Sequence, residues 1–133
     1  MLGSCLKRKS EGNNTVGDEA LNFIAYGGTS IGFETLELTG NKATGLKNIP
    51  SGAKAAVISL EVDQNASLLT YDNGLLKPFV RYIQDNATDP TIEKGMPLAH
   101  FGTIEIFEEN LRNVTFINID PTLTNVLQVS YFN

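Results

Sequence analysis

Apolar and polar residues alternate along most of the chain after residue 20, which is the pattern of strands that bury one face. The clearest case is Ala53–Val62, in which Ala56, Ile58, Leu60 and Val62 form one apolar face. The alanines would also suit a helix, but the clean period of two favours a strand.

The same period predicts strands elsewhere, and turn residues separate them. The other predicted strands are Ala20–Tyr26, Ile31–Thr39, Pro78–Gln84, Thr103–Phe107, Val114–Ile119 and Asn125–Phe132. Glu108–Asn113 is too short for a stable helix and suits a single 3₁₀ turn. Many short strands with almost no helix indicate an all-β protein, an antiparallel β-sandwich resembling a jelly roll.

One core should collect the inward-facing side chains of these strands. Its predicted members are Ile58, Leu60, Ile104, Ile106, Phe116, Leu127 and Val129. In the last strand, Val126 and Phe132 have the opposite parity from Leu127 and Val129, so they should face outward. This makes Val126 and Phe132 candidates for contact with another protein.

The stretch Lys77–Leu98 joins a strand to a long turn, around which we expect two sheets to meet. Asp85 and Asp89 can bond their own backbone, and Gly95 should supply a positive φ or room for a close neighbour. Together with Glu93, the two aspartates could instead be calcium ligands. Their spacing differs from that of the helix–loop–helix calcium loop, so turn chemistry is favoured and no metal site is predicted.

Composition divides the 133 residues into an extended N-terminal arm, residues 1–19, and a β-sandwich domain, residues 20–133. The arm is polar, without periodicity, and holds Lys7, Arg8 and Lys9 with no acid among its first ten residues. Residues 11–133 hold all 15 acidic residues of the chain and are clearly acidic overall. Nucleic acid is therefore not an expected partner, and no apolar run is long enough to predict a membrane span.

Catalytic and cofactor-binding constellations are not found in the sequence. His100 is the only histidine, so a histidine metal cluster is excluded, and we interpret it as a structural or surface residue. Cys5 is the only cysteine, so it has no disulfide partner within the chain. Acid pairs among Glu105, Glu108 and Glu109 would suit a glycosidase, but solvation of the surface is the simpler reading.

Four segments occur in an order that resembles a known family. They are IPSGAKAAVISLEVD (Ile49–Asp63), VRYIQDNATDPTIEKGMPL (Val80–Leu98), ENLRNVTFINI (Glu109–Ile119) and LQVSYF (Leu127–Phe132). The order is similar to that of small β-sandwich virion proteins encoded by tailed bacteriophages and prophages. The resemblance covers residues 49–133, and members more often have Asp-Gly where this chain has Asp85-Asn86.

The resemblance implies a structural part of a phage particle without enzymatic activity. The leading hypothesis is a capsid decoration or auxiliary head protein, located in the virion and attached through its N-terminal arm. A tail accessory or fibre-attachment protein is the alternative. The expected partners are other virion proteins, the major capsid protein or tail proteins, together with further copies of the chain in an oligomer or lattice.

Within the arm, apolar anchors and charge contacts are both available for such a partner. Leu2 and Leu6 are the predicted anchors, and Lys7, Arg8 and Lys9 are the predicted charge contacts to an acidic or groove-like surface.

A hypothesis of another class is a carbohydrate-binding β-sandwich that holds a surface glycan between the Tyr71–Asn73 loop and the Asp85–Glu93 turn. Glycan binding uses aromatic platforms, and the chain has no Trp. The tyrosines expected at the surface are Tyr26, Tyr71, Tyr82 and Tyr131.

Overall fold

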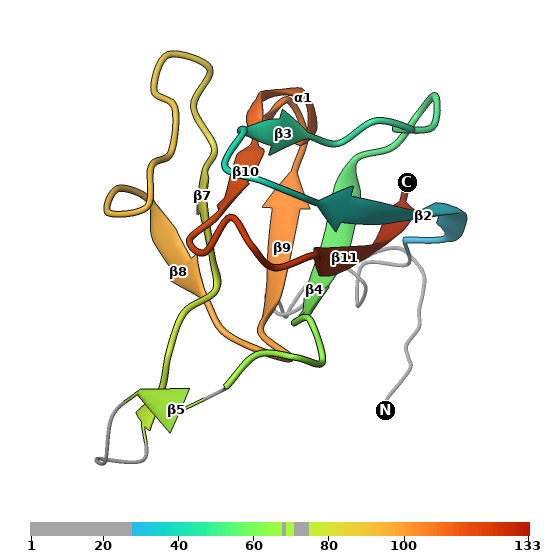
Figure 1. Cartoon of the computed structure of the whole chain (residues 1–133). Helices are drawn as coiled ribbons and strands as arrows, with labels where there is room; N and C mark the ends of the chain where they lie inside the picture. Colours follow the sequence, from blue (N-terminus) through green and yellow to red (C-terminus); the bar gives the residue numbers. More distant parts are fainter. Residues whose placement is uncertain (1–27, 68, 71–74) are drawn as a thin grey trace.

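The computed structural model describes residues 28–67, 69–70 and 75–133. The predicted strand Ala20–Tyr26 and the arm, residues 1–19, lie outside the described residues. The described part is a β-sandwich of two four-stranded antiparallel sheets with almost no helix, as the alternation predicted (Figure 1).

The first sheet has the strand order β2-β11-β4-β9. Its strands are β2 (Ser30–Leu38), β11 (Asn125–Phe132), β4 (Ala55–Glu61) and β9 (Thr103–Phe107). β11 is interior and pairs with β2 and β4, and β4 pairs with β9. Long alternating sequences form these strands because one face of each is buried against the other sheet.

The second sheet has the order β3-β10-β7-β8 and shorter strands. They are β3 (Thr44–Gly45), β10 (Thr115–Asn118), β7 (Val80–Ile83) and β8 (Met96–Leu98). A separate two-stranded ribbon consists of β5 (Leu69–Thr70) and β6 (Leu75–Leu76). The helix α1 (Asn110–Asn113) is a single turn between β9 and β10.

Three details differ from the sequence predictions. α1 is a turn of α-helix rather than 3₁₀, because the Val114 N–H reaches the Asn110 carbonyl four residues back at 2.9 Å. The turn within Lys77–Leu98 does not separate the sheets, since its flanking strands β7 and β8 pair with each other. The chain changes sheet after β8, between Leu98 and Thr103.

The core lies between the sheets and contains all the predicted members. Ile58, Leu60, Ile106, Phe116, Leu127 and Val129 are buried in one cluster, and Ile104 packs against it partly buried. The ring centroids of Phe116 and Tyr82 lie 5.9 Å apart in a tilted pair across β10 and β7. Tyr82 and Tyr131 are core residues, so the expectation that they lie at the surface was wrong.

A pair of buried asparagines ties the two sheets together. Asn118 on β10 donates to the Leu38 carbonyl on β2 at 2.7 Å and to the Leu123 carbonyl at 3.1 Å. Its own side-chain oxygen accepts a hydrogen bond from the Asn125 amide on β11 at 2.9 Å. The Asn125 side-chain oxygen in turn accepts the Asp63 N–H at 3.0 Å. The side chains of these two buried asparagines are thus hydrogen-bonded, as burial of a polar group requires.

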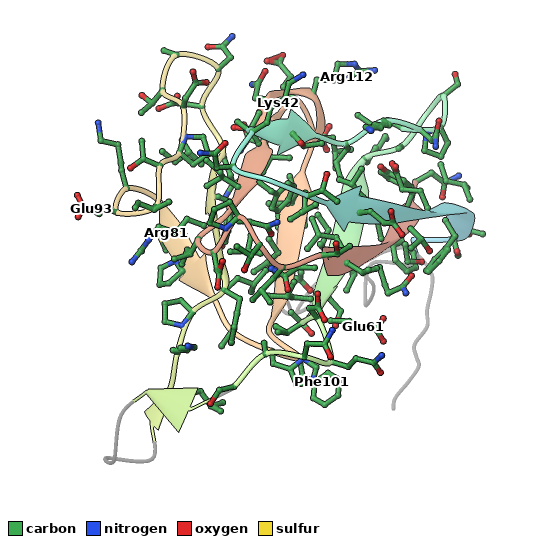
Figure 2. All side chains as sticks on the ribbon, viewed as in Figure 1. Lys42, Glu61, Arg81, Glu93, Phe101 and Arg112 are labelled. Carbon is green, nitrogen blue, oxygen red and sulfur yellow. The ribbon has the colours of Figure 1, made fainter. Side chains whose placement is uncertain are left out.

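The long turn between β7 and β8 is held by its own polar groups. The Asp85 carboxylate accepts the N–H groups of Ala87 at 2.9 Å and Thr88 at 2.7 Å, and these bonds lower its pKa. The Arg81 guanidinium donates to the carbonyls of Ile92 and Gly95, both at 3.0 Å (Figure 2).

Gly95 has both properties that the sequence suggested for it. Its φ is 130°, and a Cβ there would lie 3.1 Å from the Arg81 Cβ and from the Tyr82 carbonyl. A larger residue would therefore strain the backbone and crowd β7.

Candidate functional site

Large apolar side chains gather at one end of the outer face of the first sheet. Register places Phe132, Ala55 and Phe107 in one row across β11, β4 and β9. The adjacent row contains Phe33 on β2 and Val57 on β4, with Ser130 of β11 between them. We call Phe33, Val57, Phe107 and Phe132 the outer-face aromatic patch.

This patch is only partly shielded from solvent. Phe33 is 63% exposed and Phe107 is 40% exposed, whereas Phe132 and Val57 are half-buried. Ala55 is only 3% exposed, although it lies in the same outer row between Phe132 and Phe107. Exposed apolar side chains therefore share this outer face, which is a common mark of a protein contact.

The predicted contact residues on the last strand do face outward, with the parity the sequence suggested. Val126 lies opposite Glu37 and Glu61, and Phe132 lies opposite Ser30 and Ala55. Because β11 is paired on both sides, a partner there must meet side chains on the face and cannot add a strand.

The five predicted contacts of the arm cannot be placed. Leu2, Leu6, Lys7, Arg8 and Lys9 lie outside the described residues.

Glu34 is a buried carboxylate that was not predicted from the sequence. It faces inward from β2, and one carboxylate oxygen accepts the Asn48 N–H at 2.9 Å and the Tyr131 hydroxyl. The other oxygen accepts the Lys47 N–H at 3.4 Å. Beside it lies a shallow, open groove of about 480 Å³ along β2, lined mainly by polar residues.

Burial and the Glu34 carboxylate raise the pKa of Tyr131 far above its ordinary value. In the unfolded chain Tyr131 ionises at about pH 10. The contribution of the Tyr131 hydroxyl to the free energy of unfolding is therefore fully present below about pH 10. It is lost as the pH rises above that value, because only the unfolded chain releases the proton.

We predict that the free energy of unfolding falls more steeply above about pH 10 in the native protein than in the Tyr131→Phe variant. The difference in slope corresponds to about one proton, or roughly 1.4 kcal/mol per pH unit. Urea denaturation at a series of alkaline pH values measures it. Equal slopes for the two proteins would show that the Tyr131 hydroxyl ionises normally in the folded state.

Phe101 forms an exposed aromatic projection where the chain changes sheet. It is 70% exposed with a φ of 63°, and its N–H donates to the Leu60 carbonyl at 2.8 Å (Figure 2). The His100 ring stacks on it with centroids 3.8 Å apart. The Nδ1 atom of His100 accepts the Val62 N–H at 3.1 Å, which gives this histidine a structural role.

The second sheet exposes apolar side chains at its β8 edge. Met96 on β8 and Ile92 in the preceding turn are both more than half exposed. β8 pairs only with β7 among the described strands, and its central residue, Pro97, has no N–H to offer to a further strand.

The glutamates considered for glycoside hydrolysis are exposed residues along one segment. Glu105 lies on the outer face of β9, and Glu108 and Glu109 follow at the start of the α1 turn. Glu108 has a φ of 53°, and its N–H donates to the Lys54 carbonyl at 2.8 Å. Across the described ranges, no three His, Cys, Asp or Glu residues gather to hold a metal ion.

Comparison with known proteins identifies no relative. No protein-family model matches the chain, and no curated protein or solved structure matches it either. In the described part of the chain, no helix has the length and apolar character needed to span a bilayer.

Proposed function

We propose that this protein is a non-enzymatic structural component of a tailed-phage virion, a capsid decoration or auxiliary head protein. The observation that carries the proposal is the exposed apolar area on the two-sheet body. It occurs at the outer-face aromatic patch, at Phe101, and at Ile92 and Met96 beside the β8 edge. Exposed apolar area of this kind is typical of proteins that contact several neighbours.

The motif order supports the same proposal. IPSGAKAAVISLEVD covers the turn before β4 and the strand itself, and VRYIQDNATDPTIEKGMPL covers β7, its turn and β8. ENLRNVTFINI covers α1 and β10, and LQVSYF covers most of β11. The segments that resemble the virion family therefore supply strands to both sheets of the sandwich. A tail accessory position is the alternative within the same proposal.

Charge supports attachment through the arm. Three basic residues stand at the start of a chain whose formal net charge is −5. Ordering a polar arm costs about 1–2 kcal/mol per residue in backbone entropy, so a partner surface must compensate for that cost. An acidic or grooved surface of the major capsid protein, or of a tail protein, would do so.

Removing residues 1–19 should leave the β-sandwich folded and abolish its incorporation into particles. The test is co-assembly of full-length and truncated chains, measured by the amount of each in purified particles. Replacing Lys7, Arg8 and Lys9 together by alanine should reduce incorporation strongly.

The matched control removes three positive charges from the exposed body instead, at Lys42, Lys54 and Lys94. This control should assemble normally. Normal incorporation of the truncated chain would refute attachment through the arm.

A further inference from the structure

We propose that the edge of β2 is an interaction surface that pairs with β2 of a second copy of this chain, in antiparallel orientation about Thr35. The pairing would join the two first sheets into one continuous sheet. This inference is independent of the virion role, since it concerns the protein in solution. It leaves the outer-face aromatic patch accessible, because an added strand lies beside β2 in the plane of the sheet.

β2 is the longest described strand, with nine residues, and it forms one end of the first sheet (Figure 1). Among the described strands it pairs only with β11. In the second sheet, Pro97 interrupts the β8 edge, and β3 at the other end has only two residues. A long edge strand presents a row of N–H and C=O groups that can pair with another chain.

Hydrogen bonds of the neighbouring strands show which backbone groups of β2 face this edge. The Lys54 carbonyl accepts the Glu108 N–H at 2.8 Å, and the Leu60 N–H donates to the Gly102 carbonyl at 3.0 Å. Even-numbered residues of β4 therefore bond to β9, and odd-numbered residues bond to β11, because hydrogen-bonded pairs alternate along antiparallel strands.

The same alternation continues from β4 through β11 to β2. The registers of these strands direct the backbone groups of even-numbered β2 residues towards β11. The N–H and C=O groups of Phe33, Thr35 and Glu37 consequently point away from β11, and no described residue bonds to them. These three residues form the row that is available for pairing.

The groove beside Glu34 follows this row. It is lined by Glu34 and Leu36, which face inward, and by Thr35 and Glu37, which face outward. A groove that touches residues of both faces runs along the edge of the strand. Lys47 lies across the groove, and its N–H donates to the Glu34 carboxylate at 3.4 Å. The edge is therefore open to an extended strand.

A second copy of β2 suits this edge in charge and in register. The exposed charged side chains of the groove are one acid, Glu37, and one base, Lys47. A strongly acidic or strongly basic strand would meet repulsion there, whereas two copies of the groove offer each sign to the other. When Thr35 lies opposite Thr35 of the second copy, Phe33 lies opposite Glu37. All three residues of the row then have partners, and like charges do not face each other.

Sedimentation of the full chain measures the association. The native protein should have the mass of two chains, and Thr35→Pro should have the mass of one. Proline here removes an N–H that β11 does not use, so the first sheet keeps its ladder. The matched control is Thr103→Pro at the other end of the same sheet, where the alternation turns the N–H away from β4. This control should keep the native mass.

Two charge variants test the register. Thr35 is exposed, so Thr35→Lys and Thr35→Glu should each retain the fold. Each variant alone should have the mass of one chain, because like charges would meet directly opposite one another. Mixing the two variants should restore the mass of two chains. Circular dichroism verifies the β structure of every variant, and the charge variants decide if Thr35→Pro loses it.

A native protein with the mass of one chain at every concentration would overturn the proposal. A mass of two chains that survives Thr35→Pro and both charge variants would place the contact on another surface and would overturn it as well. If the mixed charge variants failed to associate, pairing about Thr35 would be excluded.

Discussion

Replacing Leu60 by alanine is expected to lower the free energy of unfolding by ~2–5 kcal/mol. Leu60 is fully buried on β4 and lies opposite Leu127 of β11 in the register of the first sheet. Truncation would leave a cavity between the sheets, and the surrounding strands can relax into it only partly.

The matched control is Leu76→Ala, which changes the same atoms at a side chain that is 58% exposed. This substitution should change stability by less than ~0.5 kcal/mol. Chemical denaturation of both variants measures the difference. A normal midpoint for Leu60→Ala would mean that Leu60 does not face the core and that the register of β4 is wrong by one residue.

Replacing Asn118 by leucine should cost roughly 3 kcal/mol, although the two side chains have similar size. The change removes three hydrogen bonds that join β10 to β2, to Leu123 and to Asn125. The carbonyls of Leu38 and Leu123 and the amide of Asn125 would each lose a partner in or beside the core. A buried group without a partner costs about 1–3 kcal/mol, which the added apolar surface offsets in part.

Asn110→Leu is the control for this change, since Asn110 is exposed and its side chain makes one hydrogen bond, to Gln84 at 3.1 Å. Thermal or chemical denaturation should show it to be nearly neutral. If Asn118→Leu were as stable as the native protein, the asparagine pair would not hold the two sheets in position.

The long strands were predictable because burial of one face imposes a strict alternation. Thr103–Phe107 and Asn125–Phe132 have the predicted bounds, and Ala55–Glu61 lies inside its predicted range. β3 was missed because a strand of two residues carries no period. The sheet change between Leu98 and Thr103 was missed because attention falls on Asp85, Asp89 and Pro90. These residues mark a turn without revealing which strands it joins.

The sequence predicted which face of a strand the patch residues lie on, but not that they lie close together. Val126 and Phe132 were assigned to the outer face by parity, and Phe33 has the same parity as Thr35 and Glu37 along its own strand. What parity does not provide is the register between strands, which places Phe33 beside Ser130 and Phe107 beside Ala55. That pairing depends on tertiary structure, so the patch becomes visible only in the folded chain.

Glu34 has an equally clear parity signal, since it alternates in phase with the buried Leu36 and Leu38. An inward-facing glutamate contradicts the expectation that acids are solvated. Its partners, the Asn48 N–H and the Tyr131 hydroxyl, are 14 and 97 residues away in the sequence. Such partners are brought together only by the packing of a loop and a strand against β2.

Reconstruction of purified phage particles at a resolution that shows individual strands tests the virion role most directly. The particles should come from a phage that encodes this chain. We predict density for the two four-stranded sheets at regularly repeated positions on the head, with residues 1–19 in contact with the major capsid protein. Regular copies on the tail would support the alternative position. Particles that contain no copy of the chain would contradict a structural role in the virion.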